Sequence, residues 1–164
     1  MELTASAAWW FLPFVLPLCF YVAYTDMRLM RITNQAVIAL AVIFLLVGLL
    51  ALPLPIYGMR LVQLVVVLII GMVLNAGGAI GAGDAKFAAA AAPFIAPGDF
   101  RLVIAILAAA LLAAFVTHRL AKHTALRKLV PEWKSWTMGK KFPMGMALGA
   151  TLGFYLVLGT LYGA

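Results

Sequence analysis

Two aspartates are the residues of this sequence best suited to chemistry, and both lie beside long apolar runs. The chain of 164 residues has only five acidic residues, and 66% of its residues are hydrophobic. Asp84 follows the glycine-rich stretch Gly81-Ala82-Gly83, and Asp26 lies at the end of the first apolar run. A carboxylate beside membrane-spanning segments is energetically costly, so each aspartate is a candidate functional residue.

Two carboxylates brought together in a site of low dielectric share a proton, because both cannot easily ionise. The ionised carboxylate can then activate a water molecule, and the protonated one can polarise a carbonyl, as in aspartic proteases. We therefore predict Asp26 and Asp84 as catalytic residues, with no cofactor and no metal. The sequence contains no G-x-S-x-G, H-E-x-x-H or Walker motif. Its single cysteine, Cys19, excludes a disulfide or a cysteine metal cluster within one chain.

The composition predicts a membrane protein with helical spans. A span needs about 20 apolar residues, so a chain of this length has room for about six. We expect an all-α membrane protein: a bundle of about six transmembrane helices in a single domain, 1–164, with a glycine-rich loop before the fourth helix. The expected spans are 7–25, 35–52, 59–75, 85–96, 100–117 and 142–161.

Local signals place the turns between these spans. Thr33 and Asn34 are good residues to cap the second helix. Pro53 and Pro55 are expected to end that helix, with Tyr57 and Gly58 in the turn before the third.

The basic residues predict how the bundle is oriented. Positively charged loops face the cytoplasm, and of the 12 Lys and Arg residues only Arg60 and Arg101 fall on the opposite side. Both termini should therefore be non-cytoplasmic, and Asp26 and Asp84 should lie at the same, cytoplasmic end. The residues assigned to that side are Arg28, Arg31, Lys86, Arg119, Lys122, Arg127, Lys128, Lys134, Lys140 and Lys141.

The fourth span is unusually short. The helix between Asp84 and the turn at Pro97 would be about 20 Å long, against roughly 30 Å of hydrocarbon. We therefore expect the glycine segment to dip inward, with Asp84 recessed from the cytoplasmic surface and Asp26 nearer to it.

Each aspartate also has a purely structural explanation. Asp84 could cap the helix that follows it, and Asp26 could pair with Arg28 or Arg31. Lys86 could support the site or extend toward the membrane interface. The coincidence of both acids with a glycine motif favours a functional pair over these explanations.

The glycine segment and its surroundings resemble a known family. Gly81-Ala82-Gly83-Asp84-Ala85-Lys86 resembles the GxGD motif, in its GxGDxK form, of the prepilin peptidases, which are GxGD-type intramembrane aspartic peptidases. Asp26 is similar to the other catalytic aspartate, which ends the first core helix of that family. Weaker similarities are Ile32-Thr33-Asn34 to the family's Ile-Pro-Asn, and Pro143-Met144-Gly145 to its Pro-x-Gly. Within the family, this chain resembles the short form, which serves tight-adherence (Flp-type) pili.

The resemblance implies a function and a location. It implies an aspartic endopeptidase of the bacterial inner membrane that removes the short leader of type IV (Flp-like) prepilins or pseudopilins, after a glycine, at the cytoplasmic face. Asp26 and Asp84 would be catalytic, and Gly81, Gly83 and Lys86 would support the motif. Its partners would be the precursor substrate and the lipid bilayer, and no nucleic acid is expected. The process served would be pilus biogenesis and protein secretion. The large branch has an extra cytoplasmic domain with paired cysteines; neither occurs here, which argues against methyltransferase activity.

The basic segment 118–141 is expected to be a cytoplasmic or interfacial loop. Its aliphatic and tryptophan residues alternate with basic ones, which is typical of an interfacial helix held by anionic lipid. Substrate binding is the alternative, but the leaders of this family are themselves basic, so like charges would repel. His118 and His123 are expected to be solvated rather than metal ligands.

Two other functions remain open from the sequence. The aspartates could be the relay of a small proton- or cation-coupled transporter subunit. The protein could also be a non-catalytic assembly component of a secretion system.

Overall fold

The computed structural model describes residues 1–124, 127, 130–137 and 142–164. Several residues of the basic segment named above, Lys128, Lys140 and Lys141 among them, lie outside the described residues.

The described residues are mainly helical and contain no strand, so the predicted all-α fold is confirmed. Five helical segments among them are long and apolar enough to cross a membrane: Ala5–Leu29, Asn34–Ala51, Leu54–Ala76, Pro97–His123 and Met144–Tyr162. The α-helices are α1 (Ala5–Leu29), α2 (Asn34–Ala51), α3 (Leu54–Ala76), α4 (Ala82–Ala91), α5 (Phe100–His123) and α6 (Met144–Tyr162). Short 3-10 helices are η1 (Ala92–Phe94), η2 (Pro97–Asp99) and η4 (Lys134–Trp136).

The fourth helix is the short one, as its length in the sequence predicted. α4 has 10 residues, which at 1.5 Å per residue is about 15 Å. It begins at Ala82 and not at 85, so Asp84 lies inside its first turn. Two 3-10 helices, η1 and η2, then lead from α4 into α5.

One predicted helix cap is confirmed, and one predicted turn is wrong for an identifiable reason. Thr33 caps α2 as expected, since its hydroxyl accepts the N–H of Ala36 at 3.3 Å. The turn predicted at Tyr57 and Gly58 is wrong, because α3 already begins at Leu54. Proline is tolerated in the first turn of a helix, where its missing N–H would have no partner.

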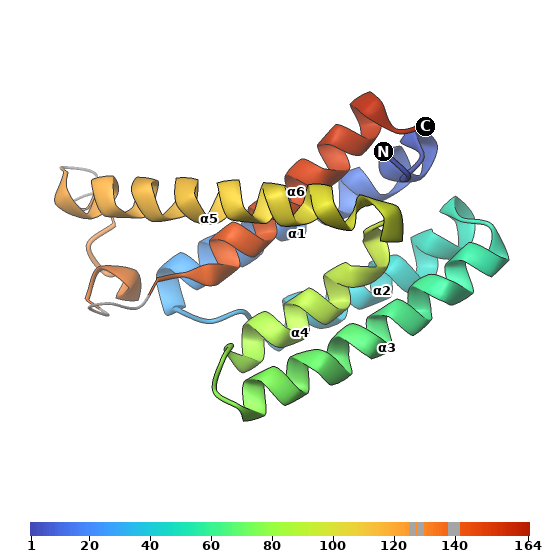
Figure 1. The fold of residues 1–164 in the computed structure, drawn as a ribbon. Coiled ribbons are helices and arrows are strands. Elements are labelled where there is room, and N and C mark those ends of the chain that lie inside the picture. The colour runs from blue at the N-terminus through green and yellow to red at the C-terminus, as the bar shows by residue number, and fades with distance from the viewer. Residues whose placement is uncertain (125–126, 128–129, 138–141) are drawn as a thin grey trace.

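The helices form two groups (Figure 1). α1 packs along α6, and α6 also packs against α5, while α4 packs against α3 and α2. Contacts of α1 with α2 and of α4 with α6 join the groups. The two chain termini lie together at one end of the bundle, and the start of α4 lies far from them (Figure 1). α1, α4 and α6 can therefore meet at that distant end.

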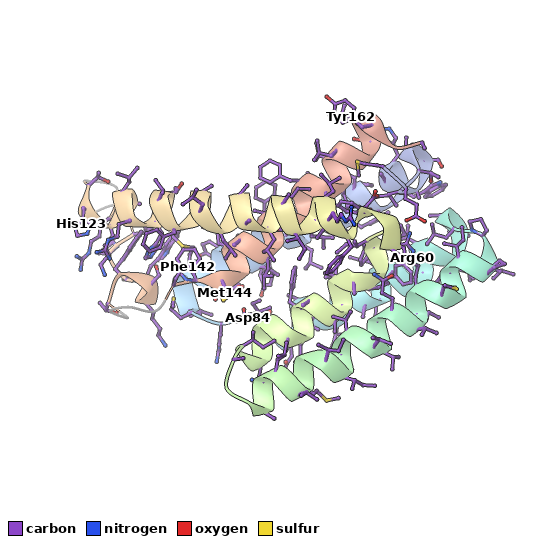
Figure 2. The ribbon with its side chains drawn as sticks, viewed as in Figure 1. Arg60, Asp84, His123, Phe142, Met144 and Tyr162 are labelled. Atoms are coloured by element: carbon purple, nitrogen blue, oxygen red, sulfur yellow. The ribbon has the colours of Figure 1, made fainter. Side chains whose placement is uncertain are left out.

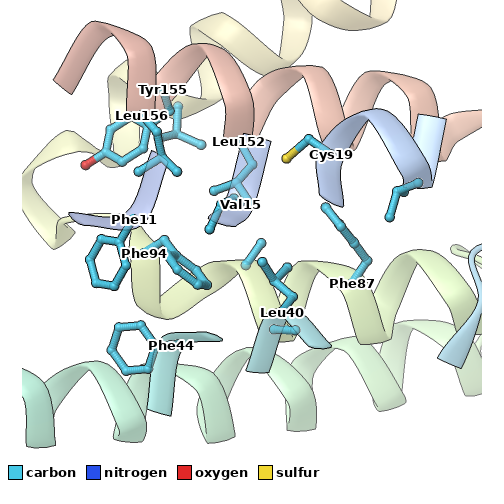
Figure 3. Close-up of a cluster of buried hydrophobic side chains, with 14 of the residues drawn as sticks. Phe11, Val15, Cys19, Leu40, Phe44, Phe87, Phe94, Leu152, Tyr155 and Leu156 are labelled. Atoms are coloured by element: carbon cyan, nitrogen blue, oxygen red, sulfur yellow. The ribbon is translucent and has the colours of Figure 1, made fainter. Parts of the chain in front are cut away.

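An aromatic cluster holds the two groups together on the side of the bundle where α1 begins, and Figure 3 shows three of its rings, Phe11, Phe44 and Phe94. The ring of Phe94 packs edge-on against Phe11 and Phe44, at centroid distances of 4.9 Å and 5.3 Å. Phe44 stacks on Tyr57 at 5.5 Å. These rings come from α1, α2, α3 and η1, and η1 directly follows α4. The cluster therefore fixes the C-terminal end of α4 relative to three long helices.

A buried polar cluster, which we call the Asp99 cluster, ties the chain together at the same end. The carboxylate of Asp99 accepts the N–H groups of Glu2 and Leu3 at 2.8 Å and 3.1 Å, and the hydroxyl of Tyr155 at 2.8 Å. The Tyr155 oxygen in turn accepts the N–H of Ala96 at 3.0 Å. The start of the chain, the α4–α5 connection and α6 are thus joined through one carboxylate.

The Asp99 cluster makes a stability prediction. Tyr155→Phe should lower the free energy of unfolding by about 1–3 kcal/mol, because it leaves buried polar groups without their partner. The measurement is the thermal unfolding midpoint of the purified protein in detergent. Tyr162→Phe is the matched control, since Tyr162 lies on the same helix and is exposed. Equal midpoints for both variants and the wild type would contradict this role.

Candidate active site

The structure brings Asp26 and Asp84 to one cavity. The cavity has a volume of about 420 Å³ and is lined by the start of α4, which lies away from the chain termini (Figure 1). Three elements contribute: the end of α1 with the connection that follows it, the start of α4, and the approach to α6. The lining residues are Asp26, Met30, Arg31, Ile32, Gly81, Ala82, Gly83, Asp84, Phe142 and Met144.

Asp26 is held by the N-terminus of α6. Its side chain is only 5% exposed, in the last turns of α1. Its carboxylate accepts the backbone N–H of Gly145 at 2.6 Å, and that of Met146 as well. The first N–H groups of a helix have no partner within the helix, so they bind a carboxylate well. Asp26 is therefore aimed by backbone and not by the arginines considered from the sequence; Arg28 donates to the hydroxyl of Tyr24.

Asp84 lies at the start of its own helix. It occupies the first turn of α4, and its carboxylate accepts the backbone N–H of Gly81, which is the N-cap residue. The N-cap is thus Gly81, and not Asp84 as the structural explanation had supposed, although Asp84 still stabilises the first turn of its helix. Capping does not account for a second carboxylate, on another helix, in the wall of the same cavity. Figure 2 shows Asp84 near Met144 and Phe142, at the approach to α6.

Ile32 packs between the first turns of α4 and α6. A Cβ added at Gly83 would lie 3.4 Å from the Cβ of Ile32, and one added at Gly145 would lie 2.9 Å from its Cγ1. Both glycines therefore allow the connection after α1 to approach closely. Ile32 and Gly145 belong to the two weaker sequence similarities, but the sequence did not indicate that either residue has a role at the site.

Lys86, predicted to support the motif, lies at the edge of this arrangement. It is exposed, and its Nζ donates to Oδ1 of Asn34 at 3.2 Å. The contact joins α4 to the start of α2, so it can steady the first turn of α4 without touching either aspartate.

The exposures of the two aspartates bear on the predicted depths. Asp26 is buried, whereas Asp84 is half-buried and follows exposed residues at positions 81 and 82. Asp26 is thus the less accessible carboxylate within the protein. The depth of each residue in the bilayer stays a prediction.

The loop predicted at 118–141 begins later than expected, and its interfacial location stays a prediction. α5 continues to His123, six residues beyond the expected end of the span. His118 is buried rather than solvated, because its ring stacks on Trp136 at 5.1 Å and packs edge-on against Phe142 at 6.0 Å. This packing fixes Phe142, which lines the cavity.

The comparison with known families agrees with this geometry. A profile described as the type IV leader peptidase family matches residues 13–118. This chain belongs to the type IV leader peptidase family. No curated protein and no solved structure matches the chain. The predicted prepilin peptidase family is thereby confirmed, and the matched stretch contains both aspartates. Gly145, which binds Asp26, lies outside it.

Gly145 provides a sharp test of how Asp26 is positioned. In Gly145→Ala, the new Cβ would lie 2.9 Å from Oδ2 of Asp26, so the carboxylate must move. A displacement of about 1 Å at a catalytic group can cost about 10²-fold in rate, and we expect a loss of that size in leader cleavage.

The matched control is Gly58→Ala on α3, where a Cβ would meet nothing within 4 Å. Cleavage of a co-expressed pilin precursor, followed by gel mobility, compares the two variants. Full activity of Gly145→Ala would show that Asp26 does not depend on this contact.

Proposed function

We propose that this protein is an aspartic endopeptidase that removes the leader peptide of type IV, Flp-like prepilins. The observation that carries the proposal is that Asp26 and Asp84, 58 positions apart in the sequence, line the same cavity. Membership of a leader peptidase family supports the substrate class.

The two carboxylates would divide the chemistry. The ionised carboxylate accepts a proton from a water molecule, whose oxygen attacks the carbonyl carbon of the scissile bond. The protonated carboxyl donates its hydrogen bond to the carbonyl oxygen as charge develops there. The tetrahedral intermediate then collapses, the C–N bond breaks, and the leaving nitrogen takes the proton that the first carboxylate had accepted from the water. The N-termini of α4 and α6 would stabilise negative charge on the carboxylates throughout.

The motif residues would support Asp84 rather than react. Gly81 supplies the N–H that its carboxylate accepts, Gly83 allows the close approach of Ile32, and Lys86 holds α4 to α2. We propose that the whole chain, 1–164, acts as one transmembrane peptidase domain. We further propose that it cleaves without methylating the new N-terminus.

We propose a bacterial inner-membrane location with the cavity at the cytoplasmic face. Exposed Arg28, Arg31 and Lys86 belong to the end of α1, the connection after it and the start of α4, and the start of α4 lies far from both termini (Figure 1). The positive-inside rule then makes the termini non-cytoplasmic. Exposed basic residues of the segment 118–141, such as Arg119 and Lys134, would contact anionic lipid.

The proposed mechanism requires both carboxylates. Asp26→Asn and Asp84→Asn each preserve size but remove one half of the pair, so each should abolish precursor processing while the protein still accumulates in the membrane. The measurement is the ratio of precursor to mature pilin, with immunoblotting of the enzyme. A transporter subunit that uses the aspartates as a relay would process no precursor at all, and substantial cleavage by either variant would refute the aspartic mechanism.

A second prediction concerns metal removal. Because two carboxylates can activate water without a metal ion, cleavage in detergent should keep its rate in excess chelator. The same rate should persist with thiol-directed reagents, since Cys19 is buried and does not line the cavity. Reversible inactivation by the chelator, restored by added metal, would contradict the mechanism.

A further inference from the structure

Met30 combines an unusual backbone conformation with a place in the wall of the cavity. It is the C-cap of α1, with φ 56° and ψ 41°, in the left-handed region. Among the described residues it is the one non-glycine residue with positive φ. Glycine is the usual residue at such helix ends, because it adopts this conformation without strain. Ending the helix therefore does not explain why a methionine is present.

The position of Met30 is fixed relative to Asp26. Its backbone N–H donates to the carbonyl oxygen of Asp26 at 2.8 Å, which closes the last turn of α1. The side chain lines the cavity that contains both aspartates, and it is half-buried. A shift of Met30 would therefore change the cavity wall directly beside Asp26, the candidate catalytic residue.

Two further apolar side chains line the same cavity from another part of the chain. Phe142, just before α6, and Met144, its first residue, are also half-buried (Figure 2). Phe142 is held by its contact with His118, and Met144 begins the helix that binds Asp26. The cavity thus has an acidic part, from the end of α1 and the start of α4, and an apolar part, from the end of α1 and the start of α6.

We propose that Met30, Phe142 and Met144 form an apolar subsite next to the carboxylates, and that Met30 sets its selectivity. The inference rests on the proposed peptidase function. Neighbouring residues of an extended peptide are only about 3.8 Å apart, so a scissile bond at the aspartates places the next side chain within reach of this wall. Methionine is flexible and polarizable and adapts to apolar groups of different shape. The occupant is therefore an apolar side chain of the precursor beside the cleaved bond.

The backbone of Met30 makes a clean experiment possible. Met30→Gly removes the side chain but suits the left-handed conformation, so the thermal unfolding midpoint should be unchanged or higher. The probe is a co-expressed type IV pilin precursor whose leader ends in glycine, in two versions with leucine or alanine after that glycine. The ratio of the leucine to the alanine cleavage rate should fall roughly tenfold in Met30→Gly, mainly through slower cleavage of the leucine version.

Two further variants check this result: a second substitution of Met30 and a matched control. Met30→Asn also tolerates the left-handed conformation and should lower the ratio in the same way. Met27→Ala is the matched control, because Met27 is a half-buried methionine on the same helix that does not line the cavity. Its ratio should equal that of the wild type.

The possible outcomes separate the inference from the function on which it rests. An unchanged ratio in Met30→Gly and Met30→Asn overturns the subsite, whether their overall activity is normal or uniformly reduced, and would leave the wall as a lipid-facing surface. Failure of the wild type to cleave either precursor is a different result, which refutes the peptidase function and the subsite together. A selective loss on the leucine version, with a maintained unfolding midpoint, supports the subsite.

Discussion

The site depends on one hydrogen-bonding arrangement: the carboxylate of Asp26 at the N-terminus of α6. Asp26 is buried on α1, and the N–H of Gly145 reaches it at 2.6 Å. A buried carboxylate without such donors would be strongly destabilising, and the first N–H groups of α6 would otherwise lack partners. Each group satisfies the other, so the packing of α1 on α6 and the placement of the acid are a single structural requirement. Asp84 repeats this chemistry with the N-terminus of its own helix.

Contacts at both ends of the bundle hold α4 in place relative to α1 and α6, which carry the Asp26 arrangement. At the site end, Ile32 fits between Gly83 and Gly145, which brings the first turn of α4 close to the first turn of α6. At the other end, the Asp99 cluster holds the connection after α4 to Tyr155 of α6. A helix of ten residues could not keep its position through its own hydrogen bonds alone. Its placement, and with it that of Asp84, comes from packing along α3 and α2 and from these contacts at its two ends.

The sequence predicted what depends on local chemistry and missed what depends on contacts between distant segments. Hydropathy predicted the helical membrane fold, and a glycine motif beside rare acids predicted Asp26 and Asp84 as a pair that the cavity brings together. The turn at Tyr57 was wrong because proline residues open a helix as readily as they end one. The role of Gly145 could not be foreseen, since it exists only because α6 returns to the end of α1, 119 residues earlier in the chain.

The central claim is that the fold holds positions 26 and 84 at one cavity in the membrane, and cross-linking measures this most directly. Asp26→Cys and Asp84→Cys would be combined in a Cys19→Ala background and treated in membranes with a short bifunctional maleimide. Intact-protein mass spectrometry should find one reagent molecule joining both thiols. Asp84→Cys with Tyr162→Cys, which places the thiols at opposite ends of the bundle (Figure 2), should instead take up two separate molecules. Two separate molecules on the 26/84 pair would contradict the claim.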